Sequence, residues 1–291
     1  MTIRVWVLLL LQLWPASAAL AEPVVVRDFL GRSVQLEAPA RRIVALAPHI
    51  VENLFSAGAG NRLVGVVSYS NFPEAARGLP LVGSYNAFSL EQIIAAQPDL
   101  ILMWGSGNGA GALQKLERLG IPVFVSELRQ LADIPASIRK LGILAGTTAR
   151  SEPEARRLER EFGRLAARFQ DKRPLSVFYQ IWHEPLQTVN GEHLISQVIG
   201  LCGGSNIFAD APTLAPRINL ESVLARNPDV IVAGGMSAAA PAWLGDWHRY
   251  PTLGAVIGNG LVAINPDHMQ RPTARILEGA QDLCARLDSL R

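Results

Sequence analysis

The sequence predicts an α/β protein made of two lobes, each with a Rossmann-like central sheet, joined by one long helix. Three observations predict it. Short apolar runs alternate with helical patterns, a similar segment occurs once in each half, and a long charged segment lies between the halves. Alternating strands and helices favour parallel sheets covered by helices.

The candidate strands are apolar on successive residues, which suits strands that are covered on both faces. They are residues 41–47, 62–68, 99–104, 121–126, 175–182, 229–234 and 260–265. Helical patterns that end in Gly lie between some of them, as at 112–120 and 193–204. We therefore expect doubly wound α/β units.

Residues 148–170 break this alternation. Their large apolar residues recur at intervals of four, three and four, which places them on one narrow stripe of a helix: Leu158, Phe162, Leu165 and Phe169. Arg and Glu occupy the other faces at spacings that allow ion pairs. A helix of about 22 residues spans roughly 33 Å. We expect it to bridge two lobes, although a crossover helix within one sheet is the alternative.

The first 21 residues are typical of a secretory signal peptide, with Arg4, an apolar stretch over 5–13 and Ala-Leu-Ala at 19–21. The apolar stretch is shorter than the roughly 20 residues that cross a bilayer. We expect a mature chain from Glu22, located in the periplasm if the source is a Gram-negative bacterium. The expected organisation is a signal peptide (1–21), an N-terminal lobe (22–147), a linking helix (148–171) and a C-terminal lobe (172–291).

Composition limits the function. With 18% charged residues and a formal charge of +2, the chain has no basic field for nucleic acid. It contains two cysteines, Cys202 and Cys284. In an oxidising compartment such a pair favours a disulfide, and two buried free thiols are the alternative.

The repeated segment reads "SLEQIIAAQPDLILMWG" at 89–105 and "NLESVLARNPDVIVAGG" at 219–235. Its first residue suits a helix N-cap, and Glu91 and Glu221 fall in the first helical turn. Each carboxylate there stabilises its helix by a few tenths of a kcal/mol. One exposed carboxylate at an equivalent point on each lobe would also suit a partner with two-fold symmetry.

Taken together, these segments resemble the periplasmic binding proteins of ABC importers whose lobes are joined by a single backbone helix (class III). This class serves cobalamin, haem and iron–siderophores. The resemblance covers essentially the whole mature chain. Within this class, the chain is most similar to the cobalamin-binding branch. The stretches that carry it are "RIVALAPHIVENLFSAGAGNRLVGVVSYSNFP", "LVGSYNAFSLEQIIAAQPDLILMW", "HLISQVIGLCGGSNIF", "INLESVLARNPDVIV" and "RPTARILEGAQDLC".

The resemblance implies a monomeric receptor, not an enzyme, that takes no cofactor and binds cobalamin (vitamin B12) or a related corrinoid. It implies that Glu91 and Glu221 dock into arginine pockets of a dimeric membrane permease, and that Cys202 and Cys284 form the family's disulfide. It also implies six ligand contacts: Tyr69, Tyr85, Trp104, Trp182, Asp267 and Arg271.

The residues themselves support part of this assignment. Tyr69, Trp104 and Trp182 lie at or just after the ends of predicted strands, and open α/β sheets bind ligands at that edge. Rigid aromatic faces there could hold a large flat macrocycle. Core packing is the alternative for each aromatic taken alone.

Two positions depart from the cobalamin-binding pattern. Tyr85 stands where those proteins have tryptophan, and Ala215 stands where they have an aromatic residue. Haem binders of this class have a tyrosine at the position of Tyr85. Binding of haem or an iron–siderophore therefore remains the alternative, and whether Tyr85 coordinates a metal stays open.

Other chemistry has weaker support. The segment "GSGNGA" at 105–110 fits a dinucleotide-binding pattern but does not follow the first strand, so we expect a loop that lines the ligand site. The five histidines lack zinc-enzyme spacing, although His183 and His268 could touch a ligand or its metal. The sequence contains no G-x-S-x-G elbow. A secreted α/β enzyme is thus the lesser alternative, and we expect no metal site of the protein's own.

Overall fold

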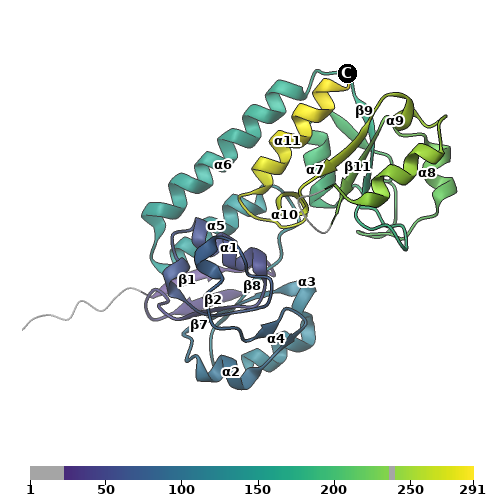
Figure 1. Cartoon of the computed structure of the whole chain (residues 1–291). Coiled ribbons are helices and arrows are strands. Elements are labelled where there is room, and N and C mark those ends of the chain that lie inside the picture. The colour runs from purple at the N-terminus through teal and green to yellow at the C-terminus, as the bar shows by residue number, and fades with distance from the viewer. Residues whose placement is uncertain (1–22, 236–239) are drawn as a thin grey trace, which may run out of the picture.

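The computed structural model describes residues 23–235 and 240–291, which form two α/β lobes (Figure 1). The expected signal peptide lies outside the described residues. Within the described part of the chain, no helix has both the length and the apolarity needed to cross a membrane.

The N-terminal lobe contains a four-stranded parallel sheet of order β4-β3-β7-β8. Its strands are β3 (Ile43–Ala45), β4 (Leu63–Val66), β7 (Leu100–Trp104) and β8 (Val123–Ser126). In β7, Leu100 and Leu102 face one apolar cluster, whereas Ile101 and Met103 face another. Both faces of the sheet are therefore covered, which explains why the strand is apolar at successive positions.

The C-terminal lobe repeats this plan with a parallel sheet of order β10-β9-β11-β12. Its strands are β9 (Leu175–Gln180), β10 (Gly204–Asn206), β11 (Val230–Gly234) and β12 (Leu261–Ile264). Val230 and Val232 of β11 pack into one cluster, and Ile231 and Ala233 pack into a second cluster on the other face. The predicted fold class, two α/β lobes with central sheets, is confirmed.

All seven predicted strands occur, but the sequence reading missed others. β10 was missed because Gly-Ser-Asn carries no apolar signal, and its pairing with β9 alone makes it a strand. Two antiparallel hairpins were also missed: β1 (Val24–Arg27) with β2 (Ser33–Leu36), and β5 (Gly83–Ser84) with β6 (Ala87–Phe88).

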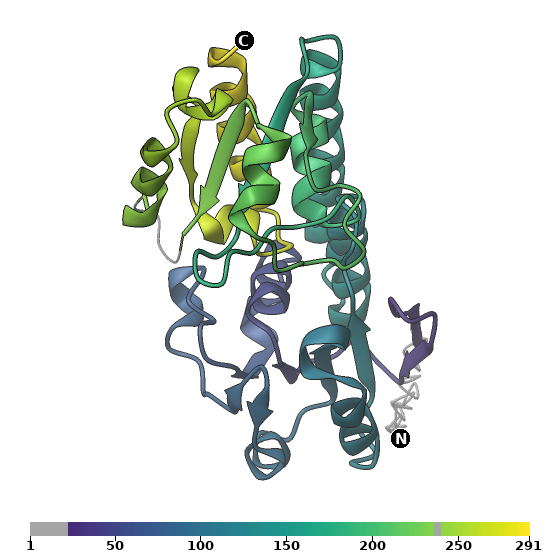
Figure 2. The same ribbon diagram turned by 90° about the vertical axis from the view of Figure 1, so that its right-hand side faces the viewer.

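Helices cover both sheets (Figures 1 and 2). In the N-terminal half they are α1 (Pro48–Ser56), α2 (Leu90–Ala95), α3 (Gly105–Asn108), α4 (Ala110–Glu117) and α5 (Asp133–Ala145). In the C-terminal half they are α7 (Leu194–Leu201), α8 (Leu220–Arg226), α9 (Gly254–Ile257), α10 (Pro266–Met269) and α11 (Ile276–Ser289). Short 3-10 turns are η1 (Gly60–Arg62), η2 (Glu74–Ala76) and η3 (Ala242–Arg249).

The long helix α6 (Thr148–Phe169) runs along one side of the molecule from one lobe to the other (Figure 2). Its buried apolar residues include Leu158, Phe162 and Phe169, as the stripe in the sequence predicts. It packs against α5 of the N-terminal lobe and against α11 of the C-terminal lobe. On α5, Arg139 lies 2.8 Å from the Glu152 carboxylate of α6, which adds an ion pair to this packing.

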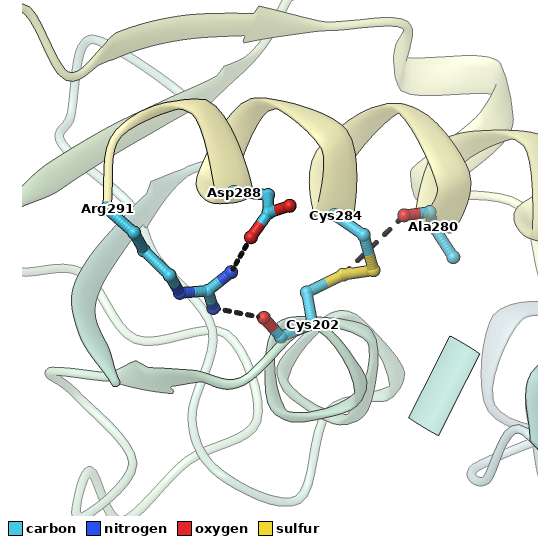
Figure 3. The surroundings of a disulfide bond; sticks show 5 residues. All are labelled: Cys202, Ala280, Cys284, Asp288 and Arg291. Atoms are coloured by element: carbon cyan, nitrogen blue, oxygen red, sulfur yellow. Dashed lines mark hydrogen bonds and ion pairs between the residues drawn. A yellow bond between two sulfur atoms is a disulfide. The ribbon is translucent and has the colours of Figure 1, made fainter. Parts of the chain in front are cut away.

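A disulfide joins Cys202, the C-cap of α7, to Cys284 of α11 (Figure 3). Both cysteines are buried. The C-terminal Arg291 donates a hydrogen bond to the Cys202 carbonyl and lies 3.4 Å from Asp288 (Figure 3). The expected disulfide is thus present, and it fixes the last helix of the chain to the C-terminal lobe.

Candidate ligand cleft and docking carboxylates

The two lobes meet at a cleft beside the carboxyl end of β7. A cavity of about 120 Å³ there is lined by residues from both lobes. Trp104, Glu127 and Arg129 come from the N-terminal lobe, and His193 and Gln270 come from the C-terminal lobe. A ligand in this position would touch both lobes at once.

On the N-terminal lobe, Trp104 and Tyr85 form an aromatic pair with ring centroids 5.9 Å apart. Trp104 is the last residue of β7, and the 41% exposed Tyr85 lies in the turn between β5 and β6. The Asn108 side chain accepts a hydrogen bond from the Trp104 backbone N–H and donates to the carbonyls of Tyr85 and Leu46. One amide therefore holds both aromatic residues in place.

The glycine-rich segment after β7 supports the Trp104 ring. A Cβ atom on Gly107 would lie 1.9 Å from Cε3 of Trp104, far inside van der Waals contact. The indole therefore lies directly on the backbone of α3, and Ser106 of the same segment lines the cleft. The pattern that resembles a dinucleotide loop is explained here by aromatic packing.

Gly107→Ala is expected to displace the Trp104 indole from this position. Because the ring packs at the cleft, we expect ligand affinity to fall by about tenfold, or roughly 1.4 kcal/mol, in the range of a displaced aromatic contact. The measurement is a ligand titration monitored by calorimetry. Gly111→Ala in α4 is the control, because no atom beyond its chain neighbours and the local helix backbone lies within 4 Å of its added Cβ. Equal affinities for both variants would contradict this role of Gly107.

His49 also packs against Trp104. The two rings meet edge to face with centroids 5.4 Å apart, and His49 is only 5% exposed. Burial, with the Arg271 charge as a smaller cause, lowers the pKa of His49 from 6.5 to about 3. Its imidazole is therefore neutral at physiological pH and serves as packing for the indole.

This buried imidazole predicts a loss of stability in mild acid. Below pH 6.5 the unfolded chain takes up a proton at His49 that the folded chain does not, so stability is full above pH 6.5 and falls as pH drops toward 3. The expected loss between pH 7 and pH 5 is about 2 kcal/mol. Urea unfolding of the wild type and His49→Gln at both values tests this. Identical pH dependence in the two proteins would rule it out.

The C-terminal lobe has an aromatic cluster of its own. Trp182, His183 and Trp243 line a cavity of about 310 Å³. Trp182 is 42% exposed and donates its indole N–H to the Glu184 carbonyl at 2.9 Å. The His183 ring stacks on Trp243, with centroids 5.5 Å apart and an interplanar angle of 5°.

Sequence reasoning missed Trp243. The only signal was the aromatic density of the segment 243–250, which contains Trp243, Trp247 and Tyr250 and no strand pattern. Trp247 is buried and donates its indole N–H to the Gln180 side chain at 2.9 Å. Of the two tryptophans in this segment, Trp243 alone lines the cavity beside Trp182.

Of the other predicted contacts, Tyr69 lies in the loop after β4, Asp267 in α10 and Arg271 in the segment between α10 and α11. Tyr69 is 77% exposed and adopts a left-handed backbone (φ 66°). Asp267 and Arg271 face each other at 3.2 Å. Arg271 is less available than its position in the sequence suggested, because its Nη1 also lies 2.7 Å from the buried Glu52 carboxylate.

The structure thus joins Tyr85 to Trp104 and Asp267 to Arg271, and it places Trp182 on the opposite lobe. His268 lies 3.5 Å from Glu278, and His183 lies 3.9 Å from Asp246. Among residues 23–235 and 240–291, no group of three or more His, Cys, Asp or Glu side chains is arranged to hold a metal ion.

The two carboxylates of the repeated segment occupy equivalent positions. Glu91 is in the first turn of α2 and Glu221 is in the first turn of α8, and both are exposed. Ser89 and Asn219 cap the two helices by accepting hydrogen bonds from Gln92 and Ser222. Bonds from a backbone N–H and from the Ser89 hydroxyl hold the pKa of Glu91 below its ordinary value. In Figure 1 each helix lies on the part of its lobe remote from α6.

Two α/β lobes, one connecting helix and a cleft between the lobes define a two-lobed ligand receptor. The family described as periplasmic binding protein matches residues 43–250. The chain therefore belongs to the periplasmic binding protein family. Its relatives in this family are binding proteins, and the family implies an ABC importer permease and a small-molecule ligand as partners.

Particular relatives share most of the chain. A vitamin B12-binding protein of Vibrio campbellii is 34% identical over 254 residues, which cover 87% of this chain and 91% of that protein. A vitamin B12-binding protein of Pectobacterium carotovorum is 35% identical over 252 residues, covering 86% and 89%.

Among solved structures, the periplasmic vitamin B12 binding protein of Vibrio cholerae aligns with a TM-score of 0.79 and 31% identity. That alignment covers 87% of this chain and 98% of the other. A periplasmic heme-binding protein from Roseiflexus shares the fold at a TM-score of 0.75 and 23% identity, covering 87% and 100%.

Proposed function

We propose that the protein captures cobalamin or a related corrinoid in the periplasm and delivers it to an ABC importer. The observation that carries this proposal is the similarity to vitamin B12-binding proteins at 34–35% identity over nearly the whole chain. The mature receptor would consist of the lobes 22–147 and 172–291 joined by the helix 148–171, acting as a monomer and without catalysis.

Aromatic residues on both lobes support a large, flat ligand. Trp104 and Tyr85 form a pair on one lobe, and Trp182 and Trp243 line a cavity on the other, and we infer that the ligand contacts both groups. Aromatic rings give a macrocycle a large apolar contact area, while the Tyr hydroxyls can bind its amide groups. Tyr69 would contact the ligand from the loop after β4, and Asp267 and Arg271 would contact it from α10 and the segment that follows.

Haem is the second candidate, and one observation favours it. Tyr85 is 41% exposed beside the cleft, so its hydroxyl is accessible to the iron of a bound haem. The same hydroxyl serves equally as a hydrogen-bond donor to a corrin amide, so Tyr85 does not decide between the two ligands.

A visible spectrum distinguishes these ligands. The purified protein is mixed with cyanocobalamin or with hemin, desalted and scanned. We expect corrin bands to remain with the protein at one equivalent. A retained Soret band with no corrin bands would show that the ligand is haem and not cobalamin. A colourless protein in both mixtures would contradict both ligands.

A further inference from the structure

A buried carboxylate connects the two lobes beside the cleft. Glu52 lies on α1 of the N-terminal lobe and is 3% exposed. Its Oε1 accepts hydrogen bonds from Arg271 at 2.7 Å and Arg275 at 2.8 Å, and its Oε2 accepts a second bond from Arg275 at 2.9 Å. Both arginines belong to the segment between α10 and α11 in the C-terminal half.

Neighbouring contacts attach the same segment to the N-terminal lobe. Asn53, next to Glu52 on α1, donates its amide to the Pro272 carbonyl at 3.0 Å. The Arg275 guanidinium lies over the Phe72 ring, 3.9 Å from its centroid. The segment therefore contacts both α1 and the loop after β4.

A second, uncharged connection joins other parts of the lobes. Gln197 of α7 accepts a hydrogen bond from the Leu131 N–H at 3.0 Å and donates to the Arg129 carbonyl at 2.9 Å. α6, the Glu52 cluster (Glu52, Arg271 and Arg275) and the Gln197 contact are thus three connections between the lobes. Among these three connections, only the Glu52 cluster buries charge, and a buried charge is strongly unfavourable once it loses its partners.

We propose that Glu52 is a positioning residue that sets the angle between the lobes and so the separation of the helices that carry Glu91 and Glu221. A change in lobe angle moves α1 relative to the Arg271–Arg275 segment. Apolar contacts tolerate small displacements, but three charged hydrogen bonds to one carboxylate depend on a narrow geometry. Arg271 also pairs with Asp267 at the cleft, so a ligand that contacts either residue acts on this cluster directly.

Spin labels on the two docking helices measure this angle. Ala95 of α2 and Ala225 of α8 are both exposed, and each is replaced by Cys to carry a label. In the described part of the chain the native cysteines are bonded to each other and leave no free thiol to be labelled. Pulsed electron paramagnetic resonance then gives the distribution of label–label distances in the ligand-free protein.

Glu52→Gln is expected to broaden this distribution and shift it to longer distances. Glu154→Gln is the matched control, because Glu154 also accepts two hydrogen bonds from one guanidinium, that of Arg157, and both residues lie on the same helix, α6. The control is expected to reproduce the wild-type distribution. A wild-type distribution in Glu52→Gln, or equal broadening in Glu154→Gln, would overturn the proposal.

Arg275→Lys is the second variant, and it tests the proposal if Glu52→Gln does not fold. It keeps the positive charge but cannot supply both the Nε and Nη2 hydrogen bonds to Glu52, so a smaller shift in the same direction is expected. An unchanged distribution overturns the proposal here too. The inference rests on the proposed docking role of Glu91 and Glu221, but distances in ligand-free protein are independent of ligand identity and of transport.

Discussion

Replacing Glu91 and Glu221 together by Ala is expected to reduce ligand transport to background while leaving ligand affinity unchanged. Both carboxylates are exposed at the starts of capped helices, away from the residues that line the cleft. Truncating one partner of a buried, hydrogen-bonded charge pair at an interface costs about 2–5 kcal/mol, so the loss of both carboxylates from arginine pockets removes most of the docking energy. Each substitution costs its helix only a few tenths of a kcal/mol, so folding persists.

The measurement compares uptake by a reconstituted importer with ligand binding by the isolated receptor. Glu37→Ala with Asp171→Ala is the control, since it also removes two exposed carboxylates. Normal uptake in the Glu91/Glu221 variant would show that these two glutamates do not dock the receptor on the permease. A loss of affinity in that variant would instead place these residues in the ligand site.

Removing the disulfide is expected to have the largest effect on stability. Cys202 and Cys284 are 82 residues apart in sequence. Opening a loop of that size restores conformational entropy to the unfolded chain, which lowers the free energy of the unfolded state by about 4.5 kcal/mol. The replacement Cys202→Ala with Cys284→Ala should therefore lower the free energy of unfolding by about this amount, and detachment of α11 from α7 should begin unfolding in the C-terminal lobe.

Urea denaturation of the wild type and the double variant measures the difference. Reducing agent should bring the wild type to the midpoint of the variant and leave the variant itself unchanged. Equal urea midpoints for the oxidised wild type and the variant would show that the crosslink does not stabilise the fold.

The sequence predicted the sheets well because strands covered on both faces are apolar throughout. The run at 99–104 became β7 with Leu100 to Met103 buried. β10 could not be predicted, because Gly204–Asn206 has no apolar character and becomes a strand by pairing with β9. The hairpin of β1 and β2 is short, and only alternate residues such as Val34 and Leu36 are buried.

The candidate site was predicted unevenly for a similar reason. Glu91 and Glu221 stood out because a whole segment is repeated around them. Glu52 was not singled out, because its partner Arg271 is 219 residues away in sequence and its carboxylate resembles any other in a helix. His49, Asn108 and Gly107 were missed as supports of Trp104, since packing of one side chain on another leaves no local pattern.

Intrinsic fluorescence tests most directly the claim that a corrinoid binds between the aromatic residues of the two lobes. Beyond the expected signal peptide the chain contains four tryptophans; Trp104 lines the cleft between the lobes, and Trp182 and Trp243 line the cavity on the C-terminal lobe. Titration with cyanocobalamin should quench this fluorescence to a plateau at one equivalent, and Trp104→Phe and Trp182→Phe should each reduce the quenched fraction. Weak quenching that never saturates, or a plateau that is unaffected in both variants, would contradict binding in this cleft.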